Sequence, residues 1–365
     1  MSEALEWGLI GHRNSGSYPN VGGELARQIA EPGVAQRYGL SPKPLFIVKT
    51  SGIYEADGET PSAVSSLTDV NDFPDVTFVA LPSTDDGLVA YDNIAHILDR
   101  GKRVVTAEKG AIANNFADLE ARSENFQRLG ITATVGGGTR MIKIAQEYCQ
   151  VHPDITQIHV TPNGTTTAML SLIGPQGGAA GVSLGIAADQ VVRLGYAEPP
   201  GPGSSQTPQE IIKGEAEGDI PKKTAIFFNA VGLGDTVLDW KKLQFELKPE
   251  DIVRVIKEAT ERRFIVSYYS KQFFQEFVSR SDDDTVGGFS VEHDGWQIVG
   301  GFQHVGQNPL FGELATLNGP GNGVVFGLGH NERYGHPVLK GSGAGPGPTA
   351  YTMLSDYLAM RRDSA

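Results

Sequence analysis

Short apolar runs alternate with amphipathic stretches through the first part of the chain. The runs predicted to be buried strands are residues 6–11, 45–48, 76–81, 104–106 and 131–135. Helical patterns lie between them, at residues 22–31, 92–102 and 117–130. Short buried strands that alternate with helices are typical of βαβ units, whose strands form a parallel sheet. We therefore expect an α/β fold that begins with a doubly wound parallel sheet.

The pattern changes after about residue 150. Residues 155–160 are predicted to be a strand, and residues 264–328 are largely strand-like. Helical patterns occupy residues 181–195, 221–231, 250–262 and 348–362, and Pro221 and Pro348 suit first helical turns. We expect a second α+β domain with an open sheet, for substrate binding. The expected boundaries are residues 1–150 with 336–365 for the first domain and 151–335 for the second.

Length, charge and cysteine content narrow the class of protein. A chain of 365 residues is longer than one hydrophobic core usually supports, so two domains are expected. The formal net charge of −13 favours solubility and argues against a nucleic-acid or anionic-membrane partner. The partner we expect is a small-molecule substrate. The single cysteine, Cys149, fits a reducing compartment and is expected to be a packed thiol. With no evident signal peptide or membrane segment, we expect a cytoplasmic protein.

A glycine-containing loop follows the first predicted strand. Gly11 and Gly16 occupy the outer positions of the G-x-G-x-x-G motif, and Arg13 stands where the middle glycine is usual. In a Rossmann-type fold this loop holds the pyrophosphate of a dinucleotide. A longer loop, with Asn20 capping the helix and Gly22 packing against the strand, is also consistent with the spacing. The alternative is a plain glycine-rich turn.

The second predicted strand ends in Lys49-Thr50-Ser51. Dinucleotide folds usually place an acid here to hold the ribose 2′-hydroxyl of NAD. A cation beside two hydroxyls suits a 2′-phosphate better, so the sequence favours NADP over NAD. A lysine that merely faces solvent is the alternative.

Six short sequence motifs follow one another along the chain. They are residues 104–110 (VVTAEKG), 134–138 (TVGGG), 163–166 (NGTT), 195–199 (GYAEP), 218–223 (GDIPKK) and 341–350 (GSGAGPGPTA). Each is weak alone, but the ordered set resembles the homoserine dehydrogenases, which interconvert aspartate 4-semialdehyde and L-homoserine with NAD(P)(H). The resemblance covers most of the chain and implies an oxidoreductase that assembles as a homodimer.

The resemblance also implies catalytic roles. Lys109 and Lys223 match two lysines that lie beside the reacting hydroxyl, and Asp219 matches the acid that orients an ammonium group. The chemistry is reasonable, because a lysine can donate a proton to an aldehyde oxygen that gains negative charge. Taken singly, each lysine is better explained as a surface cation, and Asp219 as a helix cap.

Substrate and cofactor contacts follow from the same match. Glu198 matches the carboxylate that receives the substrate's α-amino group, and the turn at Asn163, Gly164 and Thr165 presents polar groups to it, with Tyr196 nearby. The residues expected to bind the cofactor are Gly11, Arg13, Gly16, Val21, Lys49, Thr50, Leu81, Pro82, Thr106, Lys109 and Gly345.

Departures from the family pattern gather around the pocket. Glu108 replaces an asparagine, and Arg140 replaces a proline. Thr132 stands where some relatives have an acid for a monovalent cation, so no metal is expected. Gly214 stands about where a substrate-facing aspartate is expected, and Glu215 or Glu217 is a candidate replacement.

Three readings remain open from these departures. One is a divergent homoserine dehydrogenase. Another is a relative that acts on a different small alcohol, aldehyde or ketone, with Arg13 and Arg140 as anion-binding candidates. The last is a non-catalytic sensor that binds a nucleotide or amino acid. Because no regulatory extension follows the last helix, we do not expect feedback control through an appended domain.

Overall fold

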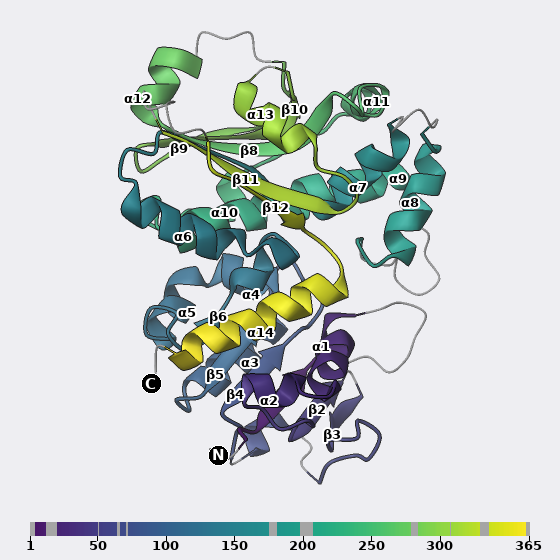
Figure 1. Ribbon diagram of the computed structural model, residues 1–365, viewed down its shortest axis with the longest axis vertical. Helices are drawn as coiled ribbons and strands as arrows, with labels where there is room; N and C mark the ends of the chain where they lie inside the picture. Colours follow the sequence, from purple (N-terminus) through teal and green to yellow (C-terminus); the bar gives the residue numbers. More distant parts are fainter. Residues whose placement is uncertain are drawn as a thin grey trace. The chain divides into compact units, whose positions relative to one another are not determined.

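The chain folds into two compact units. The computed structural model describes residues 4–11, 20–49, 51–63, 66–70, 72–174, 181–197, 207–278, 284–306, 308–328 and 336–362. Unit 1 comprises Met1–Gly138 and Gly345–Ala365, and unit 2 comprises Thr139–Ala344 (Figure 1). Because the last helix returns to unit 1, unit 2 is an insertion within it.

Unit 1 is built on a mostly parallel six-stranded sheet of order β3-β2-β1-β4-β5-β6. β2, β1, β4, β5 and β6 are parallel, and β3 is antiparallel to β2 at the edge. The strand order reverses between β1 and β4, as in dinucleotide-binding folds. The strands are β1 (Trp7–Ile10), β2 (Phe46–Lys49), β3 (Gly52–Tyr54), β4 (Val76–Val79), β5 (Arg103–Thr106) and β6 (Leu129–Gly130).

Helices complete the core of unit 1. α14 packs against α1, and its Met353 and Tyr357 are buried with Trp7 and Phe78 of the sheet. The Tyr357 and Phe78 rings meet edge to face, with centroids 6.1 Å apart. The helices are α1 (Val21–Ala30), α2 (Val34–Tyr38), α3 (Leu88–Leu98), α4 (Lys109–Asn114), α5 (Phe116–Arg122) and α14 (Pro346–Arg362), with short 3-10 turns η1 (Leu67–Asp69), η2 (Thr132–Thr134) and η3 (Gly137–Thr139).

Unit 2 is built on an antiparallel six-stranded sheet of order β12-β11-β7-β8-β10-β9. Long strands with small and aromatic residues form its centre, and the register pairs Ile158 with Tyr268. The strands are β7 (Gln157–Thr161), β8 (Arg262–Ser270), β9 (Val286–His293), β10 (Trp296–His304), β11 (Gly321–Gly327) and β12 (Val338–Ser342).

The unit 2 helices lie on both faces of this sheet. Within unit 2, α6, α7 and α10 lie on one side of the sheet and α13 lies on the other (Figure 1). The elements are α6 (Met141–Val151), α7 (Gly164–Ile173), α8 (Leu184–Arg193), α9 (Pro208–Gly214), the π-helical turn η4 (Glu215–Asp219), α10 (Ile220–Val231), η5 (Trp240–Lys242), α11 (Pro249–Lys257), α12 (Lys271–Phe273), the π-helical turn η6 (Phe274–Val278) and α13 (Pro309–Ala315).

The predicted fold class is confirmed, with a parallel sheet first and an open antiparallel sheet second. The expected boundaries at residues 150 and 336 differ from the divisions of the compact units. The reason is that α6 and β12 pack within unit 2: Gln146 on α6 donates to the Ala230 carbonyl at 2.6 Å, and β12 pairs with β11.

Several predicted elements were wrong in detail. Residues 131–135 form the turn η2 rather than a strand, and the short strand β6 precedes them. The helix expected over residues 117–130 ends at Arg122, because Glu124, Asn125 and Phe126 adopt positive φ. The helix expected to reach residue 262 ends at Lys257. Part of the strand-like stretch is helix α13, whose apolar residues face the sheet at helical spacing.

No helix in the described ranges has the length and apolar character needed to span a membrane.

Candidate active site

A polar cluster in unit 2 begins at the end of β7. Asn163 follows this strand and caps α7, and its Oδ1 accepts a hydrogen bond from the Thr166 backbone N–H at 2.8 Å. The side chain is fixed by this bond and almost fully buried, with 1% of the residue exposed. Asn163 therefore presents its remaining polar atom, Nδ2, in a single orientation.

Asp219 and Lys223 meet at this amide. They lie four residues apart, and the Lys223 Nζ is 2.6 Å from Asp219 Oδ2. The same carboxylate oxygen accepts a hydrogen bond from Asn163 Nδ2 at 2.8 Å. The two charged side chains are only 11% and 13% exposed. The predicted lysine and acid are thus brought together as a buried, hydrogen-bonded ion pair.

A second carboxylate joins the same amide. Glu215 Oε2 accepts from Asn163 Nδ2 at 2.5 Å. Glu215 opens a π-helical turn, closed by a bond from the Ile220 N–H to the Glu215 carbonyl. Such turns inside α-helices are rare and frequently occur at functional sites. The described cluster therefore contains two carboxylates and one lysine around one amide.

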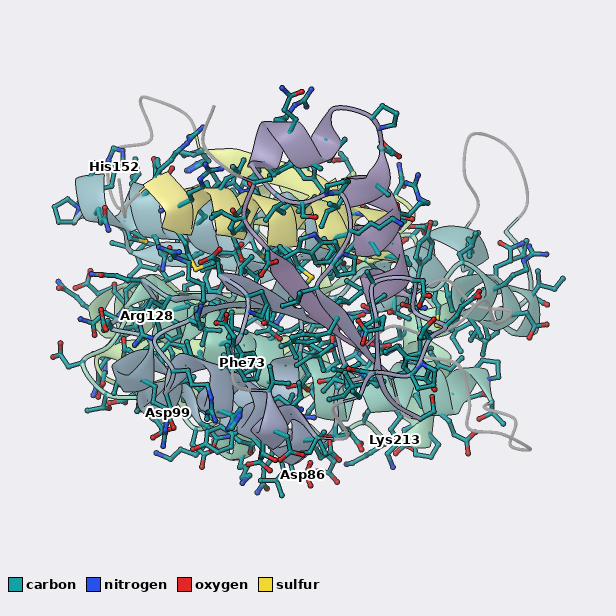
Figure 2. All side chains as sticks on the ribbon, turned by 90° about the horizontal axis from the view of Figure 1, so that it is seen from below. Phe73, Asp86, Asp99, Arg128, His152 and Lys213 are labelled. Carbon is teal, nitrogen blue, oxygen red and sulfur yellow. The ribbon has the colours of Figure 1, made fainter. Side chains whose placement is uncertain are left out.

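Glu217 lies on the same π-helical turn but takes a different partner. Its carboxylate is 3.8 Å from the Lys213 Nζ, and these side chains are 36% and 56% exposed. Lys213 lies at the surface of unit 2 (Figure 2). Of the two acids considered as replacements for a substrate-facing aspartate at position 214, Glu215 contacts the cluster and Glu217 contacts Lys213.

The N-terminus of α7 brings further predicted residues close together. Thr165 Oγ1 donates to the Tyr196 carbonyl at 2.5 Å. A Cβ on Gly164 would lie 2.8 Å from the Pro320 carbonyl oxygen, so a larger residue does not fit there. Asn163, Gly164, Thr165 and Tyr196 are therefore neighbours, whereas Glu198 lies outside the described residues.

Lys222 has a role that the sequence did not predict. It is 4% exposed, and its Nζ lies 5.0 Å from the centroid of the Trp240 ring. A cation over an aromatic face is attracted by the electrons of the ring. Lys222 therefore holds η5 against α10. The only sequence signal was a lysine pair followed, 17 positions later, by a tryptophan, which is not specific.

The predicted cofactor residues of unit 1 follow the carboxyl ends of neighbouring parallel strands. Gly11 follows β1, Lys49 ends β2, Leu81 and Pro82 follow β4, and Thr106 ends β5. The strand order reverses at β1 and β4, and ligands of such sheets bind at this point. The predicted cofactor residues therefore lie at the edge of the sheet where ligands of such folds bind.

The backbone at Gly11 needs glycine. Its φ is +102°, and a Cβ would lie 2.4 Å from the Ala80 carbonyl oxygen. The absence of a side chain lets the loops after β1 and β4 approach each other closely. This close approach explains why the first position of the G-x-G-x-x-G motif is a glycine.

Two helix starts flank this edge of the sheet. Val21 begins α1, and Asn20 caps it by accepting from the Gly23 N–H at 2.8 Å. Gly345, with φ of +106°, precedes α14. Arg13, Gly16 and Thr50 lie outside the described residues.

Lys49 is more enclosed than the sequence predicted. It is 9% exposed, its Nζ donates to the Gly58 carbonyl, and it lies 4.7 Å from the centroid of the Tyr54 ring. It lines a pocket of about 420 Å³ together with Thr68 and His96. A ligand in this pocket would meet a cation, hydroxyls and an imidazole, and also the carboxylate of Asp92.

Lys109 is the first residue of α4, and the preceding Glu108 caps that helix. The Glu108 carboxylate accepts from the Gly110 and Ala111 N–H groups at 2.8 and 2.6 Å. The Ser83 hydroxyl donates to it at 2.7 Å. Glu108, which stands where the matched motif has an asparagine, therefore stabilises the helix start, where a negative charge is favourable.

Thr132, at another of these departures, contacts the last helix. The Thr132 N–H and hydroxyl both donate to Asp356 of α14. In the described ranges no group of three or more histidine, cysteine, aspartate or glutamate residues is arranged to hold a metal. Cys149 is a free, half-buried thiol on α6, and burial raises its pKa to about 11. Arg140 adopts a φ of +53°, which a proline cannot adopt because its ring fixes φ near −65°.

Solved structures share this fold over the whole chain. A homoserine dehydrogenase from Thermoplasma acidophilum matches with a TM-score of 0.68 and 16% identity, over 98% of this chain and 99% of that one. A hyperthermophilic archaeal homoserine dehydrogenase in complex with NADPH matches with a TM-score of 0.63 and 20% identity, over 98% of each chain.

A homoserine dehydrogenase from Thiobacillus denitrificans matches with a TM-score of 0.64 and 20% identity, over 98% of this chain and 73% of that one. No protein-family model and no curated protein matches the chain. The likeness is therefore one of fold, at low sequence identity, and it extends through both units. The chain has the fold of the solved homoserine dehydrogenases.

Proposed function

We propose that this protein is an NAD(P)-dependent oxidoreductase of the homoserine dehydrogenase type, which interconverts aspartate 4-semialdehyde and L-homoserine. The observation that carries the proposal is the buried Lys223–Asp219 pair, held by Asn163 at the N-terminus of α7. These are residues that the motif order assigned to catalysis and substrate binding. The shared fold supports the same reading.

The unit 1 residues fit a nicotinamide dinucleotide. Gly11 lets the loops after β1 and β4 approach closely, because any Cβ there would meet the Ala80 carbonyl oxygen. The start of α1 offers backbone N–H groups that suit a phosphate. Lys49, at the pocket beside β2, is our candidate for contact with a 2′-phosphate, so we propose NADP as the preferred cofactor. When bound, the nicotinamide supplies the hydride donor or acceptor.

Lys223 is assigned the proton transfer. During oxidation, a neutral Lys223 Nζ takes the proton from the substrate hydroxyl as the carbonyl forms. During reduction, the ammonium form returns that proton to the carbonyl oxygen, where negative charge develops. Asp219 orients Nζ through their 2.6 Å contact. The motif match assigns Lys109 to the same oxygen and Glu198 to the substrate ammonium.

Turnover is the direct test. The purified full-length chain should oxidise L-homoserine with NADP or NAD at alkaline pH, followed by absorbance at 340 nm. Lys223→Ala should lower kcat at least about 100-fold, because general acid–base groups contribute factors of about 10² to 10⁴. Cofactor binding, measured by nucleotide fluorescence, should be nearly unchanged. Equal activity in the variant would refute the assignment of Lys223.

Lys213→Ala is the matched control. It removes a lysine from the same helical segment, but one that is exposed and paired with Glu217. Its kcat should stay within about twofold of the wild-type value, since surface ion pairs contribute little. An equal loss in both variants would mean that the segment tolerates no change, and the catalytic assignment of Lys223 would lose its support.

A different small hydroxy compound is the second candidate substrate. It is favoured by Gly214, which offers no side chain where a substrate-facing aspartate is expected, and by Glu215, which lies one position further on. A panel of hydroxy acids, amino alcohols and simple alcohols should therefore be assayed beside L-homoserine. A higher kcat/KM for a compound without an α-amino group would select this candidate.

A further inference from the structure

We propose that the face of α3 that carries Asp92, Asn93 and His96 recognises the adenine base of the dinucleotide. The inference rests on the proposed function, because it names the group that the unit 1 pocket takes beside the 2′-phosphate. Asp92 and Asn93 precede His96 by four and three residues, so their side chains share one face of the helix. All three residues line the pocket of about 420 Å³ that also contains Lys49.

The imidazole of His96 presents a hydrogen-bond donor. Its Nδ1 lies 3.0 Å from Arg100 Nη1, and Nδ1 is the acceptor because a guanidinium can only donate. A neutral ring therefore carries its hydrogen on Nε2, and a charged ring carries one there as well. Nε2 is shielded from water and has no hydrogen-bond partner in the part of the chain that the structure describes. A ligand acceptor at this wall of the pocket satisfies an N–H that is otherwise left unpaired at a cost.

Two acceptors accompany this donor on the same face of α3. Asp92 is exposed, and within the described ranges its carboxylate has no hydrogen bond or ion pair. Asn93 Nδ2 donates to the Val89 carbonyl at 2.7 Å, so the remaining polar atom of this amide is the acceptor Oδ1. The pocket thus offers acceptors and a donor from neighbouring turns of one helix.

Adenine matches this arrangement better than a 6-oxopurine does. The N6 amine of adenine is a donor and the neighbouring N7 is an acceptor, whereas a 6-oxopurine presents acceptors at both positions. The amine donates to Asp92 or Asn93 Oδ1, and N7 accepts from His96 Nε2. A 6-oxopurine turns its O6 toward a carboxylate, which can only accept. Three apolar residues of the same pocket can pack against the flat face of the base, namely Val48, Ile53 and Leu67.

The test compares NADPH with its deaminated analogue, reduced nicotinamide hypoxanthine dinucleotide phosphate. Dihydronicotinamide fluorescence gives the dissociation constant of each nucleotide for the whole chain without turnover. The wild type should bind the analogue at least about tenfold more weakly, because the acceptors on α3 lose their donor. Asp92→Asn should bring the two constants to within about threefold, since an amide can also donate to O6. Equal constants in the wild type would overturn the inference.

Asp99→Asn is the matched control. It makes the same chemical change at the end of α3, at an exposed carboxylate that pairs with Arg122 and does not line the pocket. The ratio of its two dissociation constants should equal that of the wild type. If both variants lose the discrimination, the effect belongs to the charge of the helix and not to contact with the base, and the inference fails. It also fails if Asp92→Asn keeps the full wild-type ratio.

His96→Phe tests the donor separately. Phenylalanine keeps a ring against Phe73 but removes Nε2. Both nucleotides contain N7, so both should bind the variant about tenfold more weakly, with their ratio unchanged. The 7-deaza analogue of NADPH, which lacks N7, should bind the variant and the wild type equally. A further loss with that analogue would show that His96 does not contact N7 and would remove it from the site.

Failure of the proposed function is a different result. A wild-type chain that binds neither NADPH nor its deaminated analogue rejects the dinucleotide site itself, and the inference with it. A chain that binds both nucleotides equally well keeps the dinucleotide site but rejects recognition of adenine by α3.

Discussion

His159 should make the stability of the protein depend on pH. It lies on β7, fully buried, with Nδ1 2.8 Å from Ser267 Oγ and Nε2 3.0 Å from Gln157 Oε1. The rings of Tyr269 and Phe311 pack edge to face against it. Burial, with a smaller contribution from the charge of His336, lowers the pKa of His159 from 6.5 to about 3. The folded protein therefore keeps this imidazole neutral.

The sign and size of the effect follow from proton linkage. Below pH 6.5 an unfolded chain protonates this histidine and the folded chain does not, so acid favours unfolding. The stabilisation is complete above pH 6.5 and is lost progressively as pH falls toward 3. At about 1.4 kcal/mol per pH unit, the loss between pH 7 and pH 5 is about 2 kcal/mol.

The comparison of wild type with His159→Gln isolates this contribution. The variant is expected to be less stable at pH 7, because it loses packing and hydrogen bonds, but the difference should shrink by about 2 kcal/mol at pH 5. Urea unfolding followed by tryptophan fluorescence measures both values. His152→Gln, which changes a partly exposed residue at the end of α6, is the control. A stability difference that is the same at both pH values would refute the reasoning.

Three further predictions concern unit 1. Gly11→Ala should weaken NADP binding at least tenfold and destabilise the fold by about 1–3 kcal/mol, because the added Cβ meets the Ala80 carbonyl at a residue with positive φ. Calorimetric titration measures the binding, and thermal unfolding measures the stability. Lys49→Glu should raise KM for NADP at least tenfold more than KM for NAD, and an equal change would remove Lys49 from the 2′-phosphate site. Asp356→Ala should lower the free energy of unfolding by about 1–3 kcal/mol, since it leaves the Thr132 N–H and hydroxyl without their acceptor; unchanged urea unfolding would contradict this.

The sequence predicted the alternating half of the fold well, because buried parallel strands are short apolar runs with clear ends. The runs at residues 76–81 and 104–106 became β4 and β5 almost unchanged. The errors have local causes. Three consecutive residues with positive φ end α5 early, and none of them is a glycine that would have signalled the break. α13 was not predicted, because the apolar residues of such a short segment are also compatible with a strand.

The sequence predicted several residues of the candidate site but not all of the contacts between them. Motif order selected Asn163, Asp219 and Lys223, and these residues are in contact. The choice between Glu215 and Glu217 could not be made from spacing. It depends on a π-helical turn, and no sequence pattern in the segment predicts one. Likewise, nothing in the sequence indicated that Glu108 would cap a helix, because glutamate is not among the preferred N-cap residues.

The discontinuous course of unit 1 has a consequence for synthesis on the ribosome. The segment up to Gly138 emerges first and contains every strand of the parallel sheet, but one face of that sheet needs Met353, Leu354 and Tyr357 of α14. Unit 2 is continuous and can complete its own core while the chain is still being made. The nascent first segment therefore keeps apolar surface exposed until the whole of unit 2 has been translated. Folding of unit 1 is thus completed last, although its synthesis begins first.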